Sequence, residues 1–230
     1  MEISNEILKP EKAVYHIKEF IRRTNEDEHG RYLSWIHCFN VFKENRFSAN
    51  MQTYDYLALH LAFYLASWGM YRGSSFLLQK DYKIHIPVVK MLLERKYHCL
   101  YAITPEELIK EKNLDLLMEL SHRIKFYYEN ETPSFTSRKN HATDTLITKI
   151  LMGTLGCVPA YDRYYQIAVK KYHVSTGNFN SNSIKQLCQF YIKYFDEFER
   201  CRKEISTIHI EYPPMKLMDM CFWQIGLNEE

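Results

Sequence analysis

Glycine and proline are scarce in this chain of 230 residues, which has seven of each. Both residues mark turns and interrupt regular structure, so the sequence offers few places at which helices or strands must end. Apolar residues recur at spacings of three and four almost throughout, rather than alternating at a spacing of two. We therefore expect an all-α protein with a compact, multi-helix globular fold of about ten helices, forming a single helical domain over residues 1–230 or two lobes.

Cysteine pairs and long apolar runs are also missing. The six cysteines are scattered and include no Cys-x-x-Cys pair, which excludes a zinc-ribbon spacing and the density of a small disulfide-bonded secreted domain. No segment approaches the roughly 18 uninterrupted apolar residues of a membrane-spanning helix. The N-terminus carries Glu2, Glu6 and Lys9 and has no apolar core of signal-peptide length. We therefore expect a cytoplasmic protein with reduced thiols and no membrane partner.

An excess of charge of one sign is absent as well. The chain has 30 Lys and Arg against 28 Asp and Glu, a formal net charge of +2, so any site for DNA must be a local basic patch. The ten histidines form no His-x-x-x-His or His-Glu-x-x-His motif. There is no Gly-x-Ser-x-Gly elbow, phosphate-binding loop or dinucleotide fingerprint. The sequence therefore predicts no metal site and no cofactor.

Local signals predict where the helices lie. Pro10 can open a helix that runs to a break at residues 25–30. Thr104-Pro105-Glu106-Glu107 has the pattern of a capping box that opens a helix reaching about residue 130, with or without a break near Asn113. If there are two lobes, they divide in the polar segment 129–140. The other expected helices span residues 31–45, 50–67, 74–79, 87–100, 142–152, 159–173 and 183–206, with a tail helix that follows Pro213-Pro214 and stops at Gly226.

One loop combines glycines with reactive side chains. It begins at Gly153-Thr154-Leu155-Gly156 and continues as Cys157-Val158-Pro159-Ala160-Tyr161-Asp162. The stretch Val158–Asp162, with Ile167-Ala168 behind it, resembles the loop-to-helix passage of helix-hairpin-helix DNA glycosylases of the 8-oxoguanine type, in which a Val-Pro pair precedes the catalytic aspartate. The resemblance covers about residues 157–172.

This resemblance implies a nucleic-acid-binding protein on a DNA-glycosylase-like helical scaffold, active or degenerate. In that family, a flipped-out nucleotide is attacked at its sugar by a lysine amine or an activated water, and the aspartate stabilises positive charge. Asp162 matches the aspartate but lies one residue farther from its proline. Lys149 or Lys139 would supply the amine. The glycine-containing hairpin of the family is missing, because residues 136–141 contain no glycine.

The same residues have a purely structural interpretation. Gly153 and Gly156 permit a close helix crossing or a helix end, and Pro159 can start the next helix. Asp162 would then lie in the first turn, where the helix dipole favours a negative charge.

Two basic segments are candidate binding sites. The helix after Asp162 mixes basic and aromatic side chains, which can follow phosphates and stack on bases. The turn before residues 74–79 could hold an anion, or be a tight turn with its arginine paired to a buried carboxylate. The candidate nucleic-acid contacts are Arg163, Tyr164, Tyr165, Lys170 and Lys171, and the candidate anion contacts are Arg72, Gly73 and Ser74.

Two other functions stay open. Arg23 and His29 have the spacing of helical toxin RNases of the HEPN class, in which such a pair activates the ribose hydroxyl and stabilises the scissile phosphate. Balanced charge and the missing catalytic signatures also fit a helical protein-interaction module, either a homo-oligomer or a subunit of a larger, defence-related assembly, with tyrosine-rich faces as contact surfaces. The apolar tail at residues 212–223 is expected to pack on the core or on a partner.

Overall fold

The computed structural model describes residues 7–134 and 139–229. Within these ranges there are eleven α-helices, three 3-10 helices and one π turn, and the only β-type pairing is an isolated bridge between Thr207 and Ile210. The predicted all-α fold of about ten helices is confirmed.

The elements follow one another in chain order as α1 (Pro10–Asn25), α2 (Leu33–Asn45), α3 (Met51–Ser67), η1 (Phe76–Gln79), η2 (Tyr82–His85), α4 (Ile86–Leu92), η3 (Arg95–Leu100), α5 (Pro105–Leu108), α6 (Glu111–Phe126), the π turn η4 (Tyr127–Glu131), α7 (Asp144–Thr154), α8 (Arg163–Lys171), α9 (Ser181–Lys193), α10 (Phe195–Ile205) and α11 (Pro214–Asn228).

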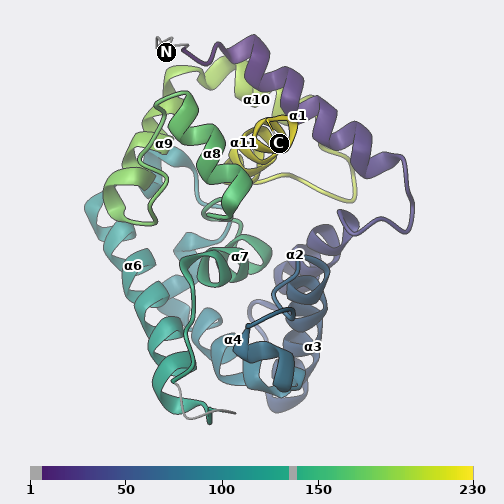
Figure 1. Ribbon diagram of the computed structural model, residues 1–230, viewed down its shortest axis with the longest axis vertical. Helices are drawn as coiled ribbons and strands as arrows, with labels where there is room; N and C mark the ends of the chain where they lie inside the picture. Colours follow the sequence, from purple (N-terminus) through teal and green to yellow (C-terminus); the bar gives the residue numbers. More distant parts are fainter. Residues whose placement is uncertain (1–6, 135–138, 230) are drawn as a thin grey trace.

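The helices form two groups that follow the chain only in part (Figure 1). α1 lies with α8–α11 in the upper half of the view, whereas α2, α3, α4, α6 and α7 fill the lower half. α5 packs against both α9 and α6 and so joins the two groups. α11 packs against α8, α1 and α10, and α7 packs against α2 and α3. The first helix is therefore held by the last ones. The boundary predicted at 129–140 stays a prediction, and residues 135–138 of it lie outside the described residues.

Polar caps begin several helices where the sequence predicts them. The Asn50 side chain accepts a hydrogen bond from the backbone N–H of Thr53 at 2.9 Å, and Thr104 accepts one from Glu107 at 3.4 Å. Each cap satisfies a backbone donor that the first helical turn leaves unpaired.

Long predicted helices are interrupted in three places. Tyr194 leaves the helical region, with φ −121° and ψ 37°, and splits the predicted helix 183–206 into α9 and α10. The helix opened by the Thr104 cap lasts about one turn and resumes at Glu111. The segment 87–100 divides into α4 and the 3-10 helix η3. Apolar periodicity alone does not distinguish one long helix from two short ones that bury the same face.

The prediction for Gly226 as a helix stop is wrong. Gly226 lies inside α11, where a Cβ atom would be 2.0 Å from the carbonyl oxygen of Tyr164 in α8. The glycine therefore permits the backbones of α8 and α11 to approach each other closely.

The apolar tail packs on the core of its own chain. α11 is buried from Pro214 to Gly226, and the Trp223 ring lies 5.7 Å from Phe20 and 5.8 Å from Trp68, both in edge-on contacts. Nine of the 18 tyrosines, half of those predicted to form contact surfaces, are buried. The tyrosines with fully buried side chains are Tyr97, Tyr128, Tyr161, Tyr165 and Tyr191.

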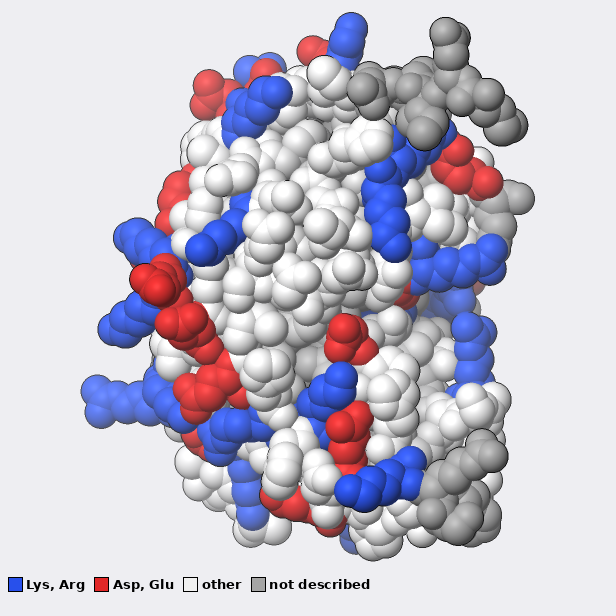
Figure 2. Space-filling model, turned by 60° about the vertical axis from the view of Figure 1, so that its left-hand side comes forward, with Lys and Arg blue, Asp and Glu red and all other residues white. Residues whose placement is uncertain are grey.

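On the face drawn in Figure 2, basic and acidic side chains alternate around a broad stretch without charged residues. None of the described helices combines the length and the apolar character needed to cross a membrane.

Candidate functional site

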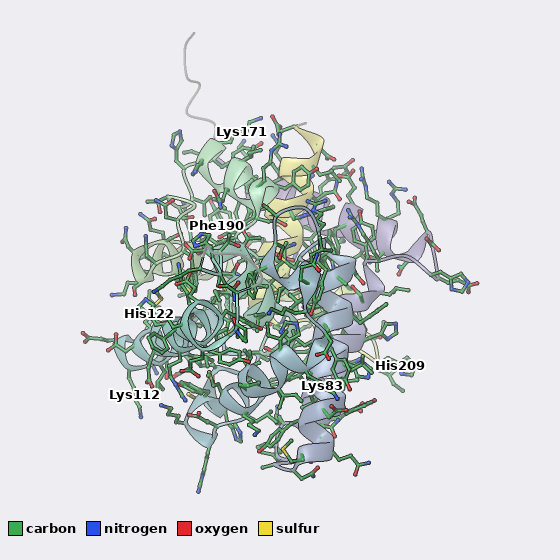
Figure 3. All side chains as sticks on the ribbon, turned by 60° about the horizontal axis from the view of Figure 1, so that its bottom comes forward. Lys83, Lys112, His122, Lys171, Phe190 and His209 are labelled. Carbon is green, nitrogen blue, oxygen red and sulfur yellow. The ribbon has the colours of Figure 1, made fainter. Side chains whose placement is uncertain are left out.

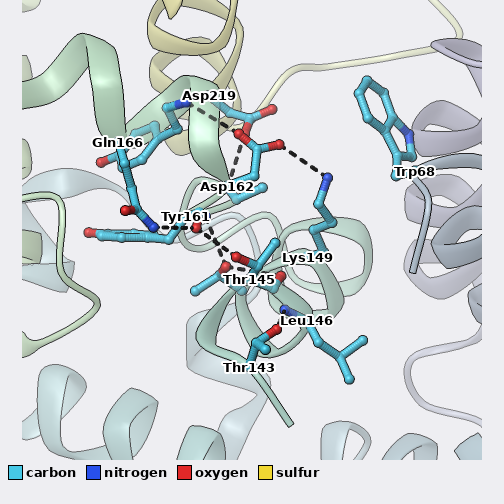
Figure 4. A network of polar contacts seen from close by, with 12 residues as sticks. Trp68, Thr143, Thr145, Leu146, Lys149, Tyr161, Asp162, Gln166 and Asp219 are labelled. Atoms are coloured by element: carbon cyan, nitrogen blue, oxygen red, sulfur yellow. Dashed lines mark hydrogen bonds and ion pairs between the residues drawn. The ribbon is translucent and has the colours of Figure 1, made fainter. Parts of the chain in front are cut away.

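A buried ion pair joins two of the three predicted catalytic residues (Figure 4). The Nζ atom of Lys149 lies 3.2 Å from Oδ2 of Asp162, and the two side chains are only 5% and 13% exposed. The same Nζ atom lies 5.1 Å from the centre of the Trp68 ring. Lys139, the third predicted residue, lies elsewhere, in a depression described below. The structure therefore selects Lys149 as the amine that faces Asp162.

Lys149 and Asp162 lie on either side of the loop that joins α7 to α8. Lys149 lies in the middle of α7, which is capped by Thr143. Asp162 is the N-cap of α8, and its Oδ1 accepts a hydrogen bond from the N–H of Tyr165 at 3.2 Å. The predictions that Pro159 starts the helix and that Asp162 lies in the first turn are therefore wrong by a few residues.

The loop before Asp162 is held by side chains from two other elements. The N–H of Tyr161 donates to Thr148 Oγ1 at 2.9 Å, and Thr145 Oγ1 donates to the Tyr161 carbonyl at 2.9 Å. The N–H of Ala160 donates to Asp219 Oδ1 of α11, also at 2.9 Å. Because these backbone groups bond to α7 and α11, the loop stays extended until Asp162 and fixes the position of its carboxylate.

Both glycines of the loop are required by close packing. A Cβ atom on Gly153 would lie 2.3 Å from the Tyr64 ring, and one on Gly156 would lie 2.6 Å from Pro213. Gly156 also has φ +64°, a left-handed conformation that ends α7. The structural interpretation of these two glycines is confirmed, and it is compatible with a site at Asp162.

A second buried ion pair lies beside the first. Lys216 Nζ is 2.7 Å from Asp219 Oδ2, with side chains 4% and 8% exposed, and it lies 4.8 Å from the centre of the Trp35 ring. Lys149, Asp162, Lys216 and Asp219 all border one small internal cavity. Sequence reasoning missed this pair, although two opposite charges three residues apart in an otherwise apolar helix are a usable signal.

Burial raises the pKa of the Asp162 carboxyl group. Loss of solvent raises its pKa above the ordinary value and the nearby Asp219 carboxylate raises it further, while the Lys149 ammonium acts in the opposite direction. Burial therefore outweighs the ion pair. A carboxylate with a raised pKa is a better proton acceptor near neutral pH.

A surface depression opens onto this ion pair, and we call it the Lys149 pocket. Its volume is about 460 Å³. It combines cationic side chains with aromatic rings, and among the described residues that line it only Asp162 carries a carboxylate. The side chains that give it this character are Arg31, Trp68, Arg72, Lys149, Asp162, Arg163, Tyr164 and Trp223.

The predicted nucleic-acid contacts divide between the two ends of α8. Arg163 and Tyr164 line the Lys149 pocket. Tyr165 is fully buried, so its prediction as a base contact is wrong. Lys170 and Lys171 lie in the last turn of α8, about 12 Å along the helix axis from the pocket end, and line no part of the pocket.

The predicted anion contacts line a second depression of about 650 Å³, which we call the Arg72 groove. Arg72 makes no ion pair with any described residue, so the predicted pairing with a buried carboxylate is wrong. Its guanidinium instead folds over Gly69, where a Cβ atom would be 3.0 Å from Nε. The polar residues of the groove are Arg72, Ser74, Ser75, Gln79, Lys139, Asn140, His141 and Thr143.

The pair proposed for a HEPN-type RNase lies away from these depressions. Arg23 bonds to Glu19 of its own helix at 3.3 Å. The His29 side chain is 86% exposed and lies 3.4 Å from Glu28. Neither Arg23 nor His29 lines the Lys149 pocket or the Arg72 groove.

No group of three side chains suited to hold a metal ion occurs among residues 7–134 and 139–229. Comparison of the chain with protein-family models, with curated proteins and with solved structures gives no match. The chemistry of the Lys149 pocket therefore has to be inferred from its own residues.

Proposed function

We propose that this protein is a DNA-processing enzyme of the glycosylase type, in which Lys149 is the amine nucleophile and Asp162 its proton acceptor. The observation that carries this proposal is the 3.2 Å contact between the Lys149 amine and the Asp162 carboxylate on the wall of a pocket that also presents arginines and aromatic rings. An amine beside a carboxylate of raised pKa can lose its proton to that carboxylate and become nucleophilic.

The proposed reaction begins with that proton transfer. The neutral Lys149 nitrogen attacks C1′ of a nucleotide, a nitrogen–carbon bond forms, and the bond from C1′ to the base breaks. The leaving electron pair goes with the base, which takes the proton from Asp162. Opening of the sugar ring, with the proton of the lysine nitrogen passing to O4′, leaves an imine between Lys149 and C1′.

The composition of the pocket supports a nucleotide as the substrate. Trp68 and Tyr164 supply aromatic rings on which a flipped-out base can stack. Arg31 and Arg72 make no ion pair with any described residue, and guanidinium groups bind phosphate through paired hydrogen bonds. The volume of the Lys149 pocket, about 460 Å³, lies within the range typical of small-molecule sites.

Borohydride reduction tests the imine directly. The protein is incubated with oligonucleotides that contain 8-oxoguanine or an abasic site, and the hydride converts the imine to a stable covalent complex. We expect the wild type to form this complex, Lys149→Gln to lose it, and Asp162→Asn to form it about 100-fold more slowly or worse.

Lys216→Gln is the matched control, because Lys216 has the same buried pairing with an aspartate but does not line the Lys149 pocket. It should retain trapping, and thermal melting should show that each variant is folded. Peptide mapping of the complex should place the modified residue at 149. Absence of trapping by the folded wild type on both substrates, or modification of a different lysine, would overturn the proposal.

A further inference from the structure

The Lys149 pocket and the Arg72 groove are adjacent and share part of their lining. Gly69, Met70 and Arg72 line both depressions. The Arg72 side chain, which is exposed and folded over Gly69, therefore stands at the junction between them. A ligand that enters the Lys149 pocket can extend past Arg72 without leaving the protein surface.

The Arg72 groove is lined by hydrogen-bond donors and contains no carboxylate among its described lining residues. Arg72 and Lys139 supply positive charge, and hydroxyl groups and the Asn140 amide supply neutral donors. His141 lines it too, with its Nδ1 atom 3.3 Å from Glu129. Another depression of about 480 Å³ on this protein differs, because it is lined by Glu106, Glu199 and Glu211 as well as by basic residues.

We propose that the two depressions form one channel for a single DNA strand. The reacting nucleotide occupies the Lys149 pocket, and the phosphates of its neighbours on one side pass Arg72 and continue into the groove at Lys139. Backbone phosphates carry one negative charge per nucleotide, and arginine, lysine, serine, threonine and asparagine side chains are their usual partners. The place of the reacting nucleotide rests on the function proposed above, whereas the phosphate path rests on the lining of the groove.

The sizes of the two depressions favour a chain over a free nucleotide. Each volume, about 460 and 650 Å³, is by itself within the range of a small-molecule site. A single nucleotide in the Lys149 pocket would leave the Arg72 groove empty. A strand can occupy both, with contacts added as its length increases.

Binding of labelled single-stranded oligonucleotides tests the channel without any covalent step. We expect the affinity of the wild type to rise with length over roughly 2 to 12 nucleotides and then to level off. Arg72→Glu and Lys139→Glu should each weaken the binding of the longer oligonucleotides by about tenfold or more. Each should also reduce the dependence of log affinity on log salt concentration by about 0.7 for every phosphate that the variant no longer neutralises.

Lys112→Glu is the matched control for the change of charge. Lys112 is an exposed lysine on α6 (Figure 3) that lines neither depression. It should bind oligonucleotides nearly as the wild type does. Because Arg72 and Lys139 are exposed, both variants should melt at the wild-type temperature.

The outcomes separate the channel from the lysine chemistry. If Arg72→Glu and Lys139→Glu bind like Lys112→Glu, or if the wild type binds no single strand at low salt, or binds only duplex, the channel is wrong. Borohydride trapping at Lys149 would still stand in each of these cases. If the channel variants lose binding while the wild type forms no covalent complex, the channel stands and the nucleophile assignment fails.

Discussion

His85 illustrates how single residues are satisfied inside this protein. Its side chain is fully buried, Nε2 lies 2.7 Å from the hydroxyl of Tyr71, and Nδ1 lies 2.6 Å from that of Tyr128. A neutral imidazole has one donor and one acceptor nitrogen, so two phenols complete its hydrogen bonding. Burial lowers the pKa of His85 to about 3, and the side chain is neutral in the folded protein at physiological pH.

Because the buried His85 side chain resists protonation, the free energy of unfolding should depend on pH. Unfolded His85 has a pKa of about 6.5, so between about pH 6.5 and pH 3 the unfolded chain binds a proton that the folded protein does not. The free energy of unfolding should therefore fall as pH is lowered through this window, by up to about 1.4 kcal/mol per pH unit from this group. Urea denaturation at several pH values measures the effect.

His85→Gln provides the comparison, because it removes the titrating group and keeps one donor and one acceptor. The variant should be less stable at neutral pH, and its free energy of unfolding should fall less steeply with acid than that of the wild type. Equal slopes for the two proteins would show that His85 is protonated in the folded state or does not contribute.

At the scale of helices, the close crossing of α7 and α3 determines where Lys149 meets Trp68. Gly153 lies one helical turn beyond Lys149 on α7 and touches the ring of Tyr64 on α3, one turn before Trp68. The Tyr64 ring is only 3% exposed and has little room to move. The absence of a side chain at position 153 therefore sets the separation of the two helices.

Gly153→Ala should destabilise the protein by about 1–3 kcal/mol through overpacking, despite the higher helix propensity of alanine. The same change should reduce borohydride trapping, because α3 carries the wall of the Lys149 pocket. In the background Tyr64→Leu, which shortens the opposing side chain, the cost of Gly153→Ala should shrink. Urea denaturation measures the loss of free energy of unfolding that Gly153→Ala causes in the wild type and in Tyr64→Leu. Equal losses would show that the strain does not come from contact with the Tyr64 ring.

For the whole molecule, contacts between the two groups of helices predict that the groups unfold together, because α5 packs against α9 and the Trp68 ring contacts the Trp223 ring of α11. Tryptophans report on both groups, since Trp35 lies in α2, Trp68 follows α3, and Trp223 lies in α11 with its ring 5.8 Å from that of Trp68. Chemical denaturation followed by tryptophan fluorescence and by far-ultraviolet circular dichroism should give coincident single transitions.

Two separated transitions would instead support lobes that divide in the segment 129–140. Limited proteolysis would then release two stable fragments on either side of it. Coincident transitions would establish the single-domain alternative.

The sequence by itself determined the local features of this protein. The spacing of apolar residues was sufficient for the all-α fold, and the Thr104-Pro105 signal was sufficient for the start of a helix, because both act over a few neighbouring residues. Local signals did not predict the break at Tyr194 or the interior position of Gly226, since both depend on which helix packs alongside.

Only the tertiary structure decided the site. Lys149 and Asp162 are 13 residues apart on different helices, and they meet because the loop between them is tied to α7 by Thr148 and to α11 by Asp219. Arg72 and Lys139 share a groove for the same reason, through the packing of distant segments. Burial then raises the pKa of Asp162, a property that no sequence spacing contains, because desolvation depends on every element that covers the group.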